Sequence, residues 1–303
     1  MVTIVPKIVQ QTDIKKKKNV SRKSGDEFEY HFALCAENLG IKCSTPKRFE
    51  QFSSVHSQCV SKCRKQCIES ALAYISKGTK LTSFVLVKDN AGKVGKTADI
   101  LFQTQTGTHP ISVSLKRNNI YTKNHRPSNL PGHLGLLDFA SYREDYARLN
   151  LKWSTHLLKK YKVYMEIPKE LKKQMLFEFA ELYHKHLKKA FEDVDLLKRY
   201  LSFIYGDSRF IVILTTKGSE RITVIDMSKF DQMLKNVECT TKLTMNVMNP
   251  HILIQMGALL IDMRLATTSK HIKKSLDLKF HAEPKGLMEA FETIQITSES
   301  LHH

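Results

Sequence analysis

Two neighbouring stretches of the chain decide its fold class, Thr97-Ala98-Asp99-Ile100-Leu101-Phe102 and Ile111-Ser112-Val113-Ser114-Leu115-Lys116-Arg117-Asn118-Asn119. In the second stretch apolar and polar residues alternate, which is the two-residue period of a β-strand with one buried face. Residues 105–110 between them include the glycine and proline typical of a hairpin loop. We therefore expect two paired strands that bring Asp99 beside Lys116.

A carboxylate and a lysine across a hairpin are the minimum set for metal-assisted cleavage of a phosphodiester. The carboxylate can hold a divalent cation, while the lysine can orient the attacking water and stabilise the charge that develops at phosphorus. Each residue also has a simpler interpretation. Asp99 alone could cap a turn, and Lys116 could belong to a solvated basic face.

The charge of the chain indicates a polyanionic partner. Lysine and arginine total 48 against 30 for aspartate and glutamate, a formal net charge of +18 on 303 residues. Such an excess suits a nucleic acid or an anionic membrane. The apolar runs are too short for a membrane-spanning helix or a secretory signal, and the lysine-rich helices lack the aromatic-edged pattern of peripheral membrane segments. We therefore expect nucleic acid as the partner and no membrane association.

The cysteines predict a reducing, cytoplasmic location. Six are present, and their spacings form no disulfide framework. Cys59, Cys63 and Cys67 recur every four residues, which could suggest zinc. No Cys-x-x-Cys pair exists, however, and the apolar stripe through this segment predicts buried cysteines on a helix.

The order of periodic segments predicts an α/β protein. Residues 1–22, with lysines at 15–18, are expected to form a basic, disordered tail, and Ser24 with Glu27 matches a capping box at a helix start. The predicted domains are a core over 23–135, a helical segment over 136–205 and a C-terminal α/β segment over 206–303. The last would complete the core, contribute to target recognition, or both. Other expected elements are a helix over 57–76 and strands near 81–88, 98–104, 110–117, 209–216, 221–226, 241–248, 258–266 and 275–281.

Helix, strand and an Asp-then-Lys hairpin in this order resemble the PD-(D/E)xK nuclease superfamily. Neighbouring residues narrow the resemblance to the HaeIII-type restriction endonucleases over about residues 25 to 281. The motifs that carry it in the first half are Gly25-x-x-Phe28-Glu29-Tyr30, Asp99-Ile100-Leu101, Ser114-Leu115-Lys116-x-Asn118 and Lys123-Asn124-His125-Arg126-x-Ser128. Those in the second half are Phe210-Ile211-Val212-Ile213-Leu214, Val224-Ile225-Asp226, Arg264, Ser275-Leu276 and Lys279-Phe280.

The resemblance implies a restriction-endonuclease-like core, a mixed central sheet flanked by helices, with additional helical and C-terminal β elements. It also implies that Asp99 is the principal Mg²⁺ ligand, that Lys116 acts at the attacking water and that Glu29 approaches the metal from the first helix. Ser114 departs from the superfamily, which usually has Glu or Asp two residues before the lysine. A serine hydroxyl can bind a metal-bound water but supplies no charge, so we expect loose Mg²⁺ binding.

The resemblance further implies double-stranded DNA as substrate and the four-base site GGCC. Arginine and lysine donors match the guanine edge in the major groove. A palindromic site suggests a two-fold homodimer, and a restriction enzyme implies a cognate methyltransferase that modifies the same site. The candidate DNA contacts are Arg117, Asn118, Asn119, Lys123, His125, Arg126 and Arg264.

Two other classes of protein stay open at this point. One is a repair or Mrr-like nuclease with little sequence specificity, which would degrade DNA to a smear rather than to discrete fragments. The other is a non-catalytic nucleic-acid-binding protein in which Ser114 marks a decayed active site. It would bind DNA in a salt-dependent way without cleaving it.

Overall fold

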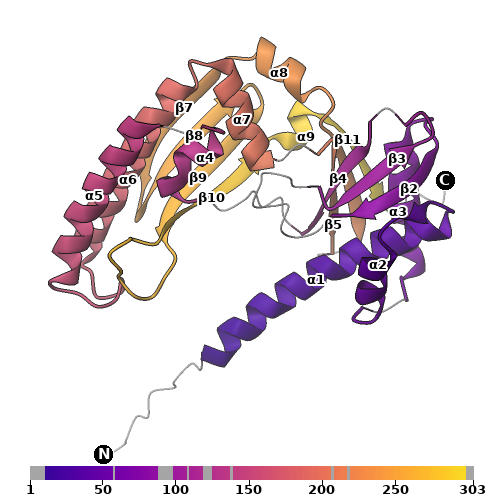
Figure 1. Cartoon of the computed structure of the whole chain (residues 1–303), viewed down its shortest axis with the longest axis horizontal. Helices are drawn as coiled ribbons and strands as arrows, with labels where there is room; N and C mark the ends of the chain where they lie inside the picture. The colour runs from indigo at the N-terminus through magenta and orange to yellow at the C-terminus, as the bar shows by residue number, and fades with distance from the viewer. Residues whose placement is uncertain are drawn as a thin grey trace, which may run out of the picture.

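The chain forms two β-sheets, each with helices packed against it, that are joined into an arch (Figure 1). The computed structural model describes residues 11–56, 59–87, 98–107, 109–118, 125–136, 139–205, 208–216 and 219–297, with side chains described from residue 25. The helices are α1 (Gln11–Asn38), α2 (Pro46–Ser53), α3 (Lys62–Ser76), α4 (Leu130–His133), α5 (Ala140–Leu158), α6 (Lys169–Ala190), α7 (Val194–Tyr205), α8 (Phe230–Asn236) and α9 (Leu287–Ala290). The strands are β1 (Lys42–Cys43), β2 (Leu81–Leu86), β3 (Ile100–Thr104), β4 (Ile111–Arg117), β5 (Phe210–Thr215), β6 (Arg221–Asp226), β7 (Cys239–Asn246), β8 (Asn249–Met256), β9 (Leu259–Thr267), β10 (Leu278–Lys285) and β11 (Glu292–Thr297).

The first sheet has seven strands in the order β1-β2-β3-β4-β5-β6-β11. The pairs β1–β2 and β4–β5 are parallel, whereas the other neighbours are antiparallel. The sheet is therefore mixed, and the α/β class expected from the sequence is confirmed. The predicted hairpin is present, because β3 pairs antiparallel with β4 and Ile100 lies opposite Val113.

Helices α1 and α3 cover one face of the first sheet. Phe28 and Phe32 of α1 pack in one apolar cluster with Val113 and Leu115 of β4. Val212 of β5 belongs to the same cluster. The apolar residues of β4, which alternate with polar ones in the sequence, therefore pack under α1, as expected for a strand with one buried face.

The opposite face of the first sheet packs against the second lobe, which consists of helices α4 to α8 and the sheet of strands β7 to β10 (Figure 1). Ile211 and Ile213 of β5 point away from α1 and join the same cluster as Leu201 of α7 and Phe230 of α8. That cluster continues into the second sheet, whose order is β10-β9-β8-β7 with every pair antiparallel. The two lobes thus share one continuous apolar core.

The expected helix start at Ser24 is wrong. Helix α1 begins at Gln11, so the backbone of residues 11–22, expected to be a disordered tail, is helical, while residues 1–10 lie outside the described residues. No glycine or proline occurs between Pro6 and Gly25, and lysine has a good helix propensity. The capping-box pattern therefore occurs inside a longer helix.

Other expected elements are divided differently in the structure. The helical segment expected over 136–205 is divided among α5, α6 and α7. Helix α7 starts separately from α6 because the Asp193 carboxylate accepts hydrogen bonds from the amides of Asp195 and Leu196. The helix expected over 57–76 begins at Lys62, with Ser61 as its N-cap. Strands β1, β8 and β11 were not predicted.

The three closely spaced cysteines differ in burial. Cys67 on α3 is buried as expected, Cys63 is partly buried, and Cys59 is exposed because it precedes the helix. The prediction of a buried cysteine is therefore wrong for Cys59. Cys63 and Cys67 are free thiols.

A buried aromatic and histidine cluster lies where the segment after β4 meets α7 and β10. His125 and His133 are 1% and 3% exposed. The ring of His133 stacks on Phe203 at 4.2 Å between centroids and meets His125 edge-on at 5.2 Å. Burial, reinforced by the charge of His125, lowers the pKa of His133 to about 2.

Lys77 joins the end of α3 to the edge of the first sheet. Its ammonium lies 3.0 Å from carboxylate oxygens of both Asp226 and Glu292. Asp226 is buried; burial by itself raises its pKa, but the hydrogen bonds from Ser228 and Lys77 outweigh this effect and hold the pKa below its usual value. Lys77 has a left-handed φ of 36°, which disfavours side chains with a Cβ.

We expect Lys77→Ala to lower the free energy of unfolding by about 1–3 kcal/mol, because it leaves the buried Asp226 without its cation. Lys77→Gly loses the same ion pair but relieves the backbone strain, so it should be about 1 kcal/mol more stable than Lys77→Ala. Urea denaturation at neutral pH measures both. An alanine variant as stable as the wild type would contradict the stabilising role of the ion pair.

We also expect His133 to make the fold sensitive to acid. The folded state keeps His133 neutral, whereas the unfolded chain protonates it near pH 6.5, so its contribution is fully present above pH 6.5 and declines toward pH 2. Between these two pH values the free energy of unfolding falls by up to about 1.4 kcal/mol per pH unit. His133→Phe preserves the stacking on Phe203, and urea titrations from pH 7 to pH 4 should show a slope shallower by about one proton. An unchanged slope would contradict this.

Candidate catalytic site

The hairpin aligns Asp99 with the polar face of β4. The Asp99 amide donates to the carbonyl of Val113 at 2.8 Å, and its own carbonyl accepts from Val87 at 3.0 Å. The backbone of Asp99 thus continues β3 between two strands. Because Ile100 lies opposite Val113, Asp99 lies opposite Ser114 and shares its face of the sheet.

Asp99, Ser114 and Lys116 form a contact group. One carboxylate oxygen of Asp99 accepts the Leu115 N–H at 2.5 Å and the Ser114 hydroxyl at 3.2 Å. The Lys116 ammonium lies 4.0 Å from the same oxygen. Ser114 is buried, whereas about a quarter of Asp99 and a third of Lys116 remain exposed. The carboxylate is therefore held by the strand backbone and still reaches the surface.

This group lies on the sheet face turned toward the second lobe. Ser114 pairs with Ile211 and Lys116 with Ile213, and both isoleucines pack into the core shared with that lobe. Glu29 is half-buried on α1, the helix that covers the opposite face. The structure thus brings three of the four expected catalytic residues together, while the fourth belongs to the helix that covers the other face of the sheet.

The donors at Asp99 suit a hard cation such as Mg²⁺. A carboxylate and a hydroxyl are oxygen ligands, which Mg²⁺ prefers, and it commonly binds through one or two carboxylates plus water and phosphate oxygens. Over the described ranges no group of three or more His, Cys, Asp and Glu side chains gathers as a metal site. The residues present fit a loosely held Mg²⁺ completed by water and substrate.

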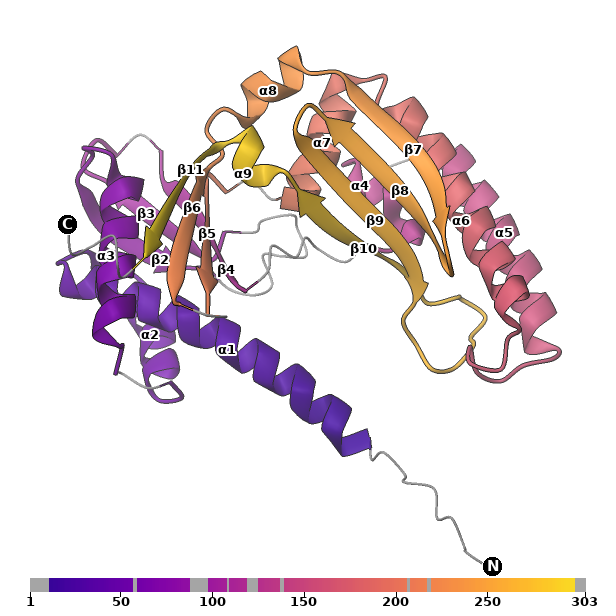
Figure 2. The ribbon, with the colours of Figure 1, turned by 180° about the vertical axis from the view of Figure 1, so that it is seen from behind.

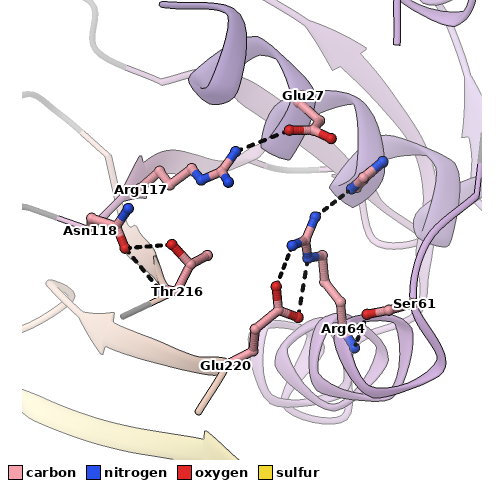
Figure 3. Close-up of polar contacts among 8 residues, drawn as sticks. Glu27, Ser61, Arg64, Arg117, Asn118, Thr216 and Glu220 are labelled. Carbon is pink, nitrogen blue, oxygen red and sulfur yellow. Dashed lines mark hydrogen bonds and ion pairs between the residues drawn. The ribbon is translucent and has the colours of Figure 1, made fainter. Parts of the chain in front are cut away.

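Two arginine–glutamate pairs, Arg117 with Glu27 and Arg64 with Glu220, lie near the carboxyl end of β4 (Figure 3). Arg117 of β4 donates to Glu27 of α1 at 3.0 Å. Arg64 of α3 makes a two-pronged ion pair with Glu220, and its guanidinium also contacts Nδ1 of His31 at 3.1 Å. Glu27 therefore pairs with Arg117 instead of capping a helix.

Sequence reasoning missed Arg64 and Glu220. They are 156 residues apart, so no spacing pattern links them. Their pairing arises because α3 packs on β6 and Glu220 lies directly before that strand.

Asn118 has a structural role at the end of β4. Its φ is 64°, a left-handed conformation that asparagine tolerates better than most residues. Its side-chain oxygen accepts from the amide and hydroxyl of Thr216 at 2.8 and 2.9 Å. Asn118 thus turns the chain out of β4 and ties it to the end of β5 (Figure 3).

The remaining candidate DNA contacts differ in accessibility. His125 is buried, its Nε2 is 3.2 Å from the Tyr200 hydroxyl and its ring stacks on Phe280, so its side chain packs in the core of this structure and not on the surface. Arg126 is more than half exposed and pairs with Asp277 at 3.2 Å. Arg264 is exposed on β9. Asn119 and Lys123 lie outside the described residues.

None of the helices in the described ranges has the length and hydropathy needed to cross a bilayer. Comparisons of the chain with known protein families and with curated proteins give no match.

Proposed function

We propose that the chain is a Mg²⁺-dependent endonuclease of restriction type that hydrolyses phosphodiester bonds in double-stranded DNA. The observation that supports this best is the group of Asp99, Ser114 and Lys116 on one face of the hairpin, with Lys116 4.0 Å from the carboxylate. The net charge of +18 supports a polyanionic substrate. The mixed sheet flanked by helices is compatible with a PD-(D/E)xK core.

Each residue of the group has a distinct role in this proposal. Asp99 would hold Mg²⁺, which when bound lowers the pKa of water and offsets phosphate charge. Lys116 orients the attacking water and provides a fixed positive charge where negative charge develops on phosphorus. Ser114 and the Leu115 N–H fix the rotamer of Asp99 through its shared oxygen. Glu29 remains a candidate for a second carboxylate, acting directly or through water.

The HaeIII-type resemblance carries the proposal of GGCC as the target. Arg126 is an accessible arginine of the candidate set, and its donors match O6 and N7 of guanine. A palindromic target implies a two-fold homodimer on DNA, and host protection implies a cognate methyltransferase for the same site.

One observation favours a second candidate function. Ser114 replaces the usual acidic residue and is buried against Asp99, which leaves a single carboxylate in the contact group. A chain with a decayed site would bind DNA without cleaving it. A nuclease of low specificity, related to repair or Mrr-like enzymes, differs from the main proposal in the fragments it produces.

We expect purified protein in Mg²⁺ to cut unmethylated plasmid into discrete fragments. Lys116→Ala should lower the rate by about 10²–10³-fold, since it removes one transition-state charge. Asp99→Asn keeps a side-chain oxygen for the Leu115 amide but loses the charge, so it should abolish cleavage while leaving the urea midpoint nearly unchanged. The matched controls are Glu144→Gln on α5 and Lys185→Ala on α6, both exposed and outside the site.

The outcomes separate the candidate functions. Fragments that map to one short palindrome and disappear in both site variants support the restriction enzyme. A smear lost in both variants supports a nuclease without specificity. Binding without cleavage in Mg²⁺ or Mn²⁺ supports the decayed site, and cleavage that persists in Asp99→Asn would exclude this group as the active site.

A further inference from the structure

The second sheet has one covered and one open face (Figure 2). Helix α6 packs on β7, β8 and β9, and His184 of α6 contacts Thr241 of β7 at 3.1 Å. On the covered side lie buried residues such as Ile252, Ile261 and Phe280. The alternate residues of the same strands point to the open side, which Figure 2 shows without a helix across it.

One cross-strand row of the open face carries a run of hydrogen-bonding side chains. Strand register places Thr244 opposite His251, His251 opposite Arg264 and Arg264 opposite His281. Adjacent strands are about 4.8 Å apart, so the four residues form a row about 14 Å long. Arg264 is exposed at its centre.

Positive charge predominates on the open face. Its cations are Lys242, Arg264, Lys279 and Lys285, and its acidic residues are Asp262 and Glu283. Asp262 is already engaged, because it lies 2.6 Å from His251 and 3.5 Å from Lys285. Burial lowers the pKa of His281, and the charges of Arg264 and Lys279 lower it further. The ion pair with Asp262 also engages Lys285, so Lys242, Arg264 and Lys279 remain against Glu283 and give the open face a net positive charge.

The open face is linked to the candidate catalytic strand. His125 follows Lys116 by nine residues and forms a β-bridge with Phe280 of β10, between Lys279 and His281. A nine-residue segment spans at most about 32 Å, which is close to one turn of duplex DNA. The edge of the second sheet therefore lies no farther from Lys116 than about one helical turn of duplex DNA.

We propose that the open face of the β7–β10 sheet, centred on Arg264 and Lys279, binds the phosphate backbone of the duplex beside the cleavage site. This rests on the proposed nuclease function and assigns the second lobe a positioning role. The side chains of the open face favour DNA as the partner, because cations outnumber acidic residues there. The row also offers imidazole, guanidinium and hydroxyl groups, which bind phosphate oxygens. Leu253 and Leu260 are its half-buried large apolar residues, which disfavours an apolar protein partner.

The test measures duplex binding in the full-length Asp99→Asn background, so that cleavage does not interfere. A labelled duplex that contains GGCC is titrated by fluorescence anisotropy at several salt concentrations. Arg264→Glu with Lys279→Glu should weaken binding at least tenfold and lower the slope of log Kd against log salt by about two. If the reversed charges prevent folding, the milder pair Arg264→Gln and Lys279→Gln serves as the test. It should also weaken duplex binding and lower the salt slope. The matched control, Lys185→Glu with Lys189→Glu at exposed positions of α6, should keep the wild-type slope.

Equal loss in the test and control pairs would overturn the inference, because it would reflect net charge alone. Unchanged binding with an altered oligomeric state in sedimentation would also overturn it, since the face would then contact protein. A wild type that binds no duplex overturns both the inference and the proposed function. A wild type that binds but does not cleave, with binding lost in the test pair only, supports the inference while rejecting nuclease activity.

Discussion

The register of β3 against β4 is the constraint on which the rest of the candidate site depends. It places Asp99 opposite Ser114 and lets the Leu115 N–H donate to the Asp99 carboxylate at 2.5 Å. A slip of one residue would move the polar set of β4 to the face that α1 covers. It would bury the Lys116 ammonium among Phe28 and its neighbours, at a desolvation cost of several kcal/mol.

Burial on both faces enforces that register. Val113 and Leu115 pack under α1, while the isoleucines of β5 beside Ser114 and Lys116 pack against the second lobe. The candidate site therefore lies where a half-polar strand, β4, meets β5, which is apolar up to its last residue, Thr215. Asp99 and Lys116 of the candidate site are both partly exposed near the end of β4.

Local contacts were predictable and distant ones were not. Asp99 and Lys116 are joined by a short hairpin, so alternation and a turn were sufficient to predict their contact. The burial of His125 and the ion pair of Arg117 depend on segments that lie far away in the sequence. His125 is buried because Phe280, 155 residues later, stacks on it, and Arg117 is held by Glu27 from α1. The residues next to His125 and Arg117 in the sequence give no indication of such distant partners.

The α/β class, the paired strands of the candidate hairpin and the excess positive charge can be predicted from the sequence, because period, turn residues and composition act over short range. The tertiary structure decided which face each helix covers, how the C-terminal strands divide between two sheets, and that β7–β10 keep one face open. These outcomes depend on how apolar surfaces far apart in the chain pack together. Strand β11 illustrates this, since it joins β6 of the first sheet after the chain has completed the second.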